Sequence, residues 1–569
     1  MEAAGDSDET SPLPSSSTTS SISHHPQYPT IDPTTFDLIV CGTGLPESVI
    51  SAAAAAAAKS VLHLDPNPFY GSHFSSLSPP SLVSFLNSSD DHPSTAPHAV
   101  EDSDDHATFY LRRRPVYSQV ETSGSFPEPS HGFLLDLVGP RVIYCADSMV
   151  DLLTRSGASN HVEFKSVDAT LMYWEGKLCL VPDSREAIFR DRTLSLGEKS
   201  QMTKFLRLIQ GHIASEQSVE EEKEGILRIP AEDLERPFTD FLQNKRLPPK
   251  IKAMILYAIT LANYDQEDAE SLKNLILTKD GIESLALYTK SVARFSNAVG
   301  AFIYPMYGHG ELPQAFCRCA AVKGALYVLR MPVSAIIVDK ETGRCKGIKL
   351  ASGQDIFSQQ VVLDSSFEVP SSMLLSNVLD KKLNSYSSDK VARGVCIANS
   401  SILPDSSNVL VIFPPKSLYP EQLTTVQVLQ LSKNIANCPP GWFVVHLSTP
   451  CNDAILGKEY IKAAINALFL VTDDGGLEIS NSSPNGSHIE EQKPTLRWCI
   501  IYVQEQKQAS FGSLCSCPMP DESLDYKFIL EATKKLFTTM YPEEDFFPAS
   551  KASEDSVEEN AEEGESLRA

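Results

Sequence analysis

The first regular pattern of apolar residues lies in the N-terminal part of the chain. Residues 36–42 form an apolar run typical of a buried strand, residues 46–60 have the alanine-rich composition of a helix, and residues 61–65 form a second apolar run. Gly42 and Gly44 stand in the turn between the first strand and the helix. A strand, a glycine turn, a helix and a second strand form the unit with which dinucleotide-binding domains begin. The pattern therefore predicts an α/β domain.

A helical segment interrupts this domain. Residues 162–182 have the pattern of strands, with a hairpin turn at 175–177. From residue 185 to about 295, apolar side chains instead recur at helical spacing, as at Phe205, Leu208, Ile209 and Ile213 and again within 250–264. We predict an all-helical domain over 183–296.

Strand-like apolar runs return after residue 300. They lie at 324–339, 361–366, 409–413, 441–449 and 496–504. We expect residues 34–182 and 297–548 to build one larger domain together, because the second segment supplies the strands that the first one lacks. The predicted fold class is α/β, with a large domain like those that bind FAD or NAD(P) and a smaller all-helical domain inserted into it.

Three stretches lack the apolar residues that a core needs. Residues 1–33 are rich in serine, threonine and proline, residues 85–106 are acidic and rich in serine, and residues 549–569 carry seven acidic side chains between Glu554 and Glu565. Such compositions cannot offset the entropy of ordering the chain. We predict that both termini are disordered and that 85–106 is an insertion in a surface loop.

Charge and cysteine content narrow the function. The 569 residues have a net charge of −25, which disfavours nucleic acids and anionic membrane surfaces as ligands. No apolar run approaches the length of a membrane span, and we expect no secretory signal peptide. The twelve cysteines have no Cys-x₂-Cys spacing, which predicts reduced thiols in the cytosol and no metal site.

The glycine turn is only half of a dinucleotide fingerprint. Gly42 and Gly44 are present, and Asp65 stands where an acid would bind the ribose. The third small position is Glu47, whose carboxylate at the helix N-terminus would repel a pyrophosphate, and Pro46 removes one backbone donor. We predict that the fold is retained and that no cofactor binds.

No catalytic constellation is evident in the sequence. His63 lies in the second strand and His309 in a glycine-flanked turn, but neither accompanies a serine or cysteine in a recognisable nucleophile motif. A Gly-x₄-Gly-Lys-Ser/Thr loop is absent, so the protein is not expected to hydrolyse nucleotides. These observations favour a binding protein over an enzyme.

Three separated blocks carry a resemblance to a known family. "FDLIVCGTGLPES" (36–48), "VLHLDPNPFYG" (61–71) and "YPMYGHGELPQAFCR" (304–318) are similar to the superfamily of Rab GDP-dissociation inhibitors and Rab escort proteins, and "FLLDLVGPRV" (133–142) resembles a further block. The resemblance covers most of 36–365 in order. It implies a dissociation-inhibitor-type large domain with a flavin-binding-type fold that holds no flavin.

Two branches of the superfamily remain open, and the escort branch is favoured. The segments "GLPES" (44–48) and "FCRCAAVKGALYVLR" (316–330) resemble escort proteins, and the chain is longer than dissociation inhibitors usually are. The alternatives are a dissociation inhibitor that recycles prenylated Rabs and, more remotely, a flavin-dependent oxidoreductase.

The resemblance also assigns candidate contact residues. Tyr70, Glu311 and Arg318 match family positions that touch the GTPase, and a helix starting near Glu311 would place Glu311 and Arg318 on one face. Tyr288 and Arg294 fall where an escort protein would meet the transferase. From the residues alone, Glu311 equally suits a helix cap, Arg318 a solvated face and Tyr288 a half-buried helix position.

The implied function is that of a non-catalytic escort subunit without cofactor. It would bind newly made GDP-loaded Rab GTPases, present them to the Rab geranylgeranyltransferase heterodimer and keep the geranylgeranylated product in solution until it reaches a membrane. A lipid chain of twenty carbons gains on the order of 15 kcal/mol on leaving water, at about 0.8 kcal/mol per carbon. A lipidated Rab therefore needs a carrier in the cytosol and, at delivery, a transient membrane contact.

Overall fold

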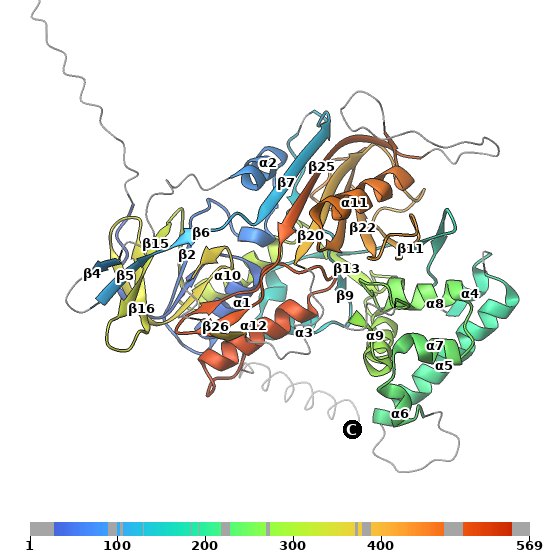
Figure 1. The fold of residues 1–569 in the computed structure, drawn as a ribbon, viewed down its shortest axis with the longest axis horizontal. Coiled ribbons are helices and arrows are strands. Elements are labelled where there is room, and N and C mark those ends of the chain that lie inside the picture. Colours follow the sequence, from blue (N-terminus) through green and yellow to red (C-terminus); the bar gives the residue numbers. More distant parts are fainter. Residues whose placement is uncertain are drawn as a thin grey trace, which may run out of the picture.

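A computed structural model describes residues 28–88, 100–102, 106–128, 130–183, 185–192, 194–217, 228–268, 274–369, 374–377, 389–471 and 493–548. These residues form two large sheets with helices packed on them. A separate group of helices lies at the lower right of Figure 1.

The first large sheet takes its central strands from distant parts of the chain. β1 (Thr35–Cys41) pairs in parallel with β2 (Val61–Asp65) on one side and with β17 (Asp355–Leu363) on the other. β2 pairs in parallel with β14 (Leu326–Leu329). The remaining strands are β16 (Cys345–Leu350), β15 (Val333–Asp339), β5 (His106–Tyr110), β4 (Val100–Asp102), β27 (Cys515–Ser516), β26 (Ser510–Gly512) and β19 (Leu374–Asn377). The parallel centre with crossover helices is the arrangement that the first apolar pattern predicts.

Three helices cover one face of this parallel centre. α1 (Leu45–Ala56) follows the glycine turn and packs against α10 (Glu311–Val322) and α12 (Lys527–Met540). The side chains of Ala52, Ala53 and Ala54 are fully buried, and their small size lets the neighbouring helices approach closely. α1 ends four residues earlier than predicted because Ala58 adopts a positive φ of 58° and turns the chain into β2.

The central strands of the second large sheet are buried on both faces. Its strands are β12 (Lys177–Leu180), β11 (Ala169–Trp174), β21 (Val409–Phe413), β22 (Val426–Leu431), β23 (Phe443–Cys451), β20 (Lys390–Ala398), β25 (Thr495–Glu505), β24 (Leu470–Val471) and β7 (Tyr117–Gly124). α11 (Ala454–Leu468) covers one face. Trp174 pairs with Lys177, which confirms the hairpin turn predicted at 175–177.

Short strands and helices join the two sheets. They are β10 (Phe164–Ser166), β13 (Phe302–Pro305), β9 (Ile143–Tyr144), β18 (Phe367–Glu368), β6 (Arg112–Arg113), β3 (Ser76–Leu77), β8 (Leu135–Asp136), α2 (Pro79–Asn87), α3 (Ser148–Ser156) and two 3₁₀ turns at Ser72–Phe74 and Ala158–His161.

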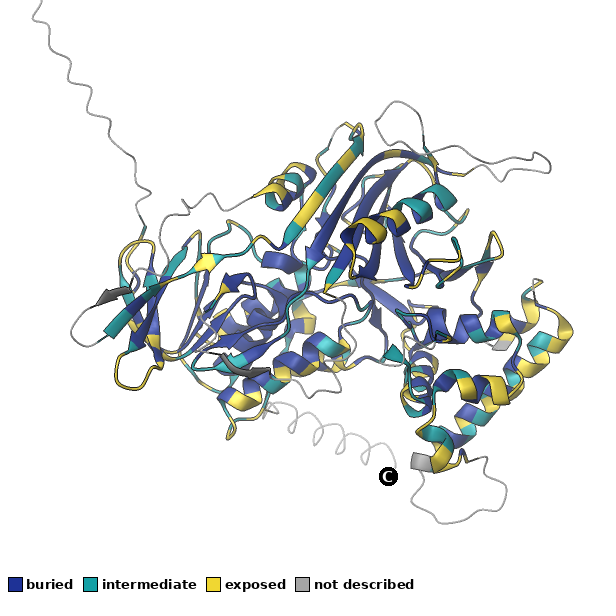
Figure 2. Cartoon of the chain, viewed as in Figure 1, coloured by how far each residue is buried: buried dark blue, intermediate teal, exposed yellow. Residues whose placement is uncertain are grey.

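The elements described between 185 and 291 are all helical. They are α4 (Arg185–Arg190), α5 (Leu196–Gln217), α6 (Ala231–Leu234), α7 (Phe238–Asn244), α8 (Pro249–Ala253), a π turn (Met254–Ile259) and α9 (Thr278–Ser291). α5 buries Phe205 and Ile209 and exposes its outer side (Figure 2). The predicted helix over 250–264 stops at Ile259, because the backbone becomes left-handed at Leu261 with φ 55°.

Two predicted boundaries of the low-complexity stretches are wrong. Ile31 is buried, and its backbone N–H and C=O bond the side chain of Gln354 at 2.9 and 2.6 Å, so the disordered N-terminal stretch does not extend to residue 33. Within 85–106, Leu86 is buried and Val100–Asp102 pairs with β5. The other residues predicted as disordered, 1–27 and 549–569, and the remainder of the insertion, 89–99 and 103–105, lie outside the described residues.

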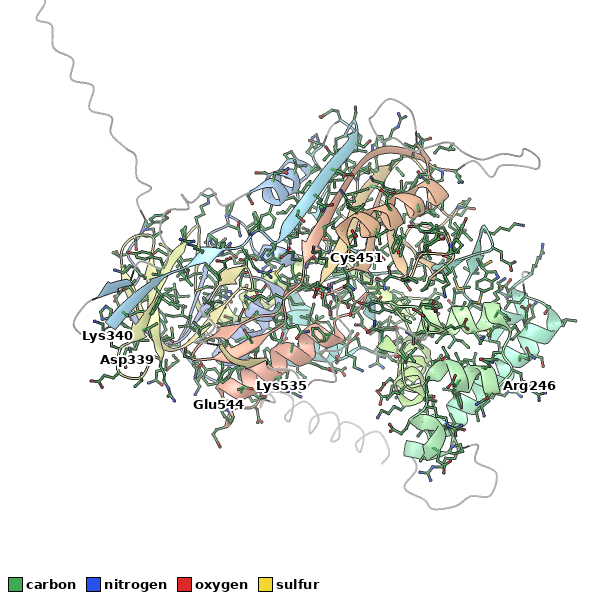
Figure 3. All side chains as sticks on the ribbon, in the orientation of Figure 1. Arg246, Asp339, Lys340, Cys451, Lys535 and Glu544 are labelled. Atoms are coloured by element: carbon green, nitrogen blue, oxygen red, sulfur yellow. The ribbon has the colours of Figure 1, made fainter. Side chains whose placement is uncertain are left out.

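The described chain ends close to its beginning. Beyond α12, Phe547 packs against Phe316 with ring centroids 6.3 Å apart, and Glu544 forms an ion pair with Lys59 at 2.6 Å (Figure 3). This contact fixes the last described residues onto the helical layer of the first sheet.

All twelve cysteines are buried and free. Across the described ranges, no group of three or more histidine, cysteine or carboxylate side chains is placed to hold a metal ion. Within the same ranges, no helix is long and apolar enough to cross a membrane.

Candidate binding surface and its buried support

Tyr70, Glu311 and Arg318 lie together at the end of β2 and along α10. Tyr70 stands half-buried in the turn after β2, Glu311 is the first residue of α10, and Arg318 is exposed two turns further along. Burial raises the pKa of Tyr70 and of Glu311, and in both cases the positive charge of Arg318 opposes the rise. The guanidinium of Arg318 is therefore near enough to both side chains to affect their pKa values.

Glu311 has a local structural partner as well. Its carboxylate accepts a hydrogen bond from the backbone N–H of Tyr307 at 3.2 Å, four residues upstream. The helix-cap interpretation is thus partly correct, since the bond fixes the turn that precedes α10. Gly310, not Glu311, is the N-cap residue.

Tyr307 was missed in the sequence. Tyr307 belongs to the glycine-rich block at 304–318 and is 51 % exposed. Its backbone N–H bonds the carboxylate of Glu311. An aromatic residue in a turn supplies a large contact area at low entropy cost, so its position directly before Gly308 was the available signal.

A buried polar network fixes this glycine-rich block from below. The carboxylate of Asp136 accepts hydrogen bonds from the hydroxyl of Tyr304, from the backbone N–H of His309 at 3.0 Å and from the hydroxyl of Ser76 at 2.5 Å. The hydroxyl of Tyr526 lies 2.6 Å from Nδ1 of His309. Burial lowers the pKa of His309 to about 4, so its imidazole is neutral at neutral pH.

Gly308 is required for this arrangement. Its φ is +87°, and a Cβ atom there would lie 2.4 Å from Oγ of Ser76 and 2.6 Å from Oδ1 of Asp136. The blocks at 133–142 and 304–318, far apart in sequence, therefore meet directly through backbone and carboxylate.

Two buried arginines hold the C-terminal segment against the same network. Arg141 donates to the carbonyl oxygens of Asp525 and Asp521 at 2.6 and 2.9 Å and forms an ion pair with the carboxylate of Asp521. Arg393 donates to Gln504 at 2.7 Å and to the carbonyl oxygen of Asp521 at 3.0 Å. Burial lowers the pKa of Arg393 to about 10, which still leaves it charged.

The glycine turn does not fit a dinucleotide. A Cβ atom on Gly42 would lie 2.6 Å from Cβ of Asp364, and one on Gly44 would lie 2.4 Å from Oε2 of Glu47. The space over both glycines, where a pyrophosphate would approach, is therefore filled by side chains of the chain itself. Asp65 accepts from the N–H and hydroxyl of Thr43 at 2.8 and 2.7 Å, so it too is engaged within the turn.

Glu47 does not carry the negative charge that the sequence analysis expected to repel a pyrophosphate. Burial, and next the charge of Asp364, raise the pKa of Glu47 to about 8, so this side chain is mostly protonated at neutral pH. Glu47 obstructs the turn by its bulk and not by a negative charge.

The structure does not bring Tyr288 and Arg294 together as a contact pair. Tyr288 is only 6 % exposed and packs edge-on against Phe302 with ring centroids 6.0 Å apart. It lines a cavity of about 100 Å³ between α9, α4 and the start of β11. Tyr288 is therefore a core residue, because the apolar face of α9 covers β13, whereas Arg294 is exposed after the end of α9.

Comparison with known proteins places these features in a family. The family model described as GDP dissociation inhibitor matches residues 32–102 and 113–480. "Rab escort protein 1" of Arabidopsis thaliana is 46 % identical over 560 residues, which cover 94 % of this chain and 98 % of that protein. "Rab proteins geranylgeranyltransferase component A 2" of Mus musculus is 30 % identical over 457 residues, 78 % of this chain and 65 % of that protein.

A solved structure shares the fold. The crystal structure of Rab GDI from Plasmodium falciparum superposes with a TM-score of 0.61 at 18 % identity, covering 90 % of this chain and 99 % of that chain. This likeness confirms the predicted α/β fold of the dissociation-inhibitor type.

Proposed function

The chain belongs to the GDP dissociation inhibitor family, and from this premise we propose that it acts as an escort protein for Rab GTPases. It binds a newly made, GDP-loaded Rab, presents the C-terminal cysteines of the Rab to a geranylgeranyltransferase and retains the lipidated product. The support is the 46 % identity to a protein named as a Rab escort protein, which extends over 98 % of that protein's length.

The observation that carries the proposal is the grouping of Tyr70, Glu311 and Arg318 on one surface. An exposed guanidinium, a half-buried carboxylate and a half-buried tyrosine ring offer directional bonds of both signs and an aromatic contact. Such a mixed surface suits a GTPase switch region better than it suits a uniformly charged ligand. The buried network of Asp136 and His309 holds it in one geometry.

Arg294 is the remaining candidate for contact with the transferase. It is exposed at the end of α9, and an arginine is a common anchor of protein interfaces. Tyr288 has no place in this contact, because its side chain is buried.

The protein itself is taken to be non-catalytic. Within the described ranges, His63, His309 and His446 are each buried and bonded to the backbone or to a neighbouring side chain. None of them accompanies an exposed cysteine, since every cysteine is buried. The covalent step therefore belongs to the transferase, while this chain acts in the cytosol and meets membranes only at delivery of the lipidated Rab.

A second function, recycling of prenylated Rabs, is favoured by the name of the matching family. The two functions share the Rab surface and differ in whether an unmodified Rab is a substrate of the complex.

A prenylation assay separates them. The full chain is mixed with an unmodified GDP-loaded Rab, the transferase heterodimer and labelled geranylgeranyl diphosphate, and the label on Rab is measured. We expect transfer that depends on the chain. Absence of transfer, together with extraction of prenylated Rab from vesicles, would assign the chain to recycling instead.

A further inference from the structure

Tyr327 lies between the candidate binding surface and the glycine turn. It belongs to β14, directly after α10, and its ring meets the ring of Tyr70 edge-on with centroids 6.1 Å apart. On its other side it meets His63 at 4.7 Å. Nε2 of His63 in turn lies 2.5 Å from the carbonyl oxygen of Gly42. A continuous series of contacts thus leads from the turn to Tyr70.

The hydroxyl of Tyr327 is fixed by the helix of the turn. It lies 3.0 Å from the hydroxyl of Ser51 in α1. The thiol of Cys317 in α10 lies 3.3 Å from the hydroxyl of Ser48, one turn before Ser51. With its hydroxyl bonded to α1 and its ring in contact with His63, Tyr327 is held from two sides.

Tyr70 has no comparable polar anchor. Within the described part of the chain, its hydroxyl makes no hydrogen bond, and Tyr327 is its one aromatic neighbour. A half-exposed tyrosine held only by ring contact would otherwise sample several rotamers and lose that freedom on binding. The orientation of Tyr70 therefore depends on Tyr327.

We infer that Tyr327 is a positioning residue that orients Tyr70 for the partner GTPase, through its hydroxyl bond to Ser51. This inference rests on the proposed function for the identity of the partner. The helix concerned is α1, which follows the turn at Gly42 and Gly44. In a dinucleotide-binding domain this helix would support a phosphate site, whereas here it supports a protein-binding surface.

The test uses the full chain and titrates an unprenylated, GDP-loaded Rab into wild type and variants. Tyr327→Phe removes only the hydroxyl, and Ser51→Ala removes its partner from the other side. Each is expected to raise Kd about three- to tenfold, the range for freeing one side chain at an interface. Tyr460→Phe is the matched control, because its hydroxyl bonds the carbonyl oxygen of Glu421 at 3.0 Å in the second sheet, and its Kd should equal that of wild type.

A double-variant cycle separates positioning from general destabilisation. In a Tyr70→Ala background, Tyr327→Phe should have no further effect on Kd, because the side chain that it orients is gone. Thermal melts of all variants accompany the titrations, and a lower melting temperature by itself would not produce this coupling.

Other outcomes overturn the inference in distinguishable ways. An equal loss of affinity in the presence and absence of the Tyr70 ring, or wild-type affinity in both Tyr327→Phe and Ser51→Ala, would show that Tyr327 does not act through Tyr70, and the escort function would be unaffected. Wild-type protein that does not bind Rab at all would overturn the proposed function together with this inference.

Discussion

The carboxyl group of Glu47 folds back over Gly44, so that a Cβ atom on this glycine would meet Oε2 of Glu47 at 2.4 Å. The third residue of α1 thereby covers the turn that precedes the helix. Because the carboxyl is buried near the charge of Asp364, the turn is closed by a group whose protonation the fold controls.

Replacing Glu47 with glutamine should stabilise the protein increasingly as the pH rises. Burial and Asp364 raise the pKa of Glu47 from 4.5 to about 8, so the folded chain keeps a proton that the unfolded chain releases above pH 4.5. The contribution of this group to the free energy of unfolding is therefore highest below about pH 4.5 and falls as the pH rises towards 8. Urea denaturation across this window should favour E47Q by about 1.4 kcal/mol more for each pH unit.

The exposed Glu341 supplies the control for this titration. Glu341→Gln should change the free energy of unfolding by less than about 0.5 kcal/mol, as exposed substitutions usually do. Glu522 and Asp525 also have pKa values raised to about 7 by burial, but they are present in every variant and cancel in the difference. A flat difference for E47Q would show that Glu47 is ionised in the folded protein.

Purified protein should carry no flavin. The space over Gly42 and Gly44 is filled by Asp364 and Glu47, and removing one obstruction leaves the other, so Glu47→Gly alone should not restore binding. The measurement is the visible absorbance of the native protein, followed by analysis of the supernatant after denaturation. Stoichiometric flavin in that supernatant would contradict the prediction and revive the oxidoreductase alternative.

Arg318→Ala should weaken Rab binding by roughly 1–3 kcal/mol, as truncation of an interface anchor does. Loss should be equal for unprenylated and prenylated Rab, because the lipid is taken to bind elsewhere. The melting temperature should hardly change, since Arg318 is exposed. Arg344→Ala, in the β15–β16 turn where Figure 3 labels Asp339 and Lys340, is the matched control. Unchanged affinity of Arg318→Ala with an intact fold would leave Arg318 as a solvated helix residue.

Breaking the buried pair of Arg141 and Asp521 should cost about 3–5 kcal/mol of unfolding free energy. Arg141→Met leaves the Asp521 carboxylate buried without its partner and removes the donor to two backbone carbonyl groups. Urea denaturation measures the loss. Arg190→Met removes an exposed ion pair with Glu186 and serves as the control, with no measurable change expected.

Deletion of parts of the two low-complexity stretches, 85–106 and 549–569, should be tolerated. Removing residues 89–99 and 551–569 leaves α2, with its buried Leu86, and the β4–β5 pair intact. Both deleted stretches lack the apolar content that would offset ordering entropy. The melting temperature should match that of wild type, whereas an insoluble product would refute the assignment of these stretches as dispensable.

Local pattern was sufficient for some features and not for others. The β1–α1–β2 unit could be read because apolar runs flank Gly42 and Gly44, and the start of α10 followed from the block that contains Glu311. The burial of Asp521 and Glu522 could not be predicted, because an acidic segment is normally exposed to solvent. The segment is buried because Arg141 and Arg393, which are distant in the sequence, bond Asp521 in the folded chain.

The candidate binding surface, too, could be predicted from the sequence only in part. The exposed position of Arg318 agrees with a helix face read from its spacing, and family resemblance alone assigned it a partner. Helical periodicity indicated that one face of α9 packs, but it did not indicate that Tyr288 lies on the packed face. The link from Tyr327 to Tyr70 depends on ring contacts between β14 and the turn after β2, for which the sequence carries no local signal.

The first sheet places β27 beside β17 and packs α12 on α1, so its beginning and its end in the chain are neighbours. During synthesis on the ribosome, the apolar face of α1 therefore has no complete cover until residues 527–540 have been made. A premature stop codon between residues 517 and 526 would leave the strands of both sheets present, yet α1 would lack its contact with α12. Such shortened products would be substrates for chaperones and proteases, so even late nonsense alleles of this gene should behave as full losses of function.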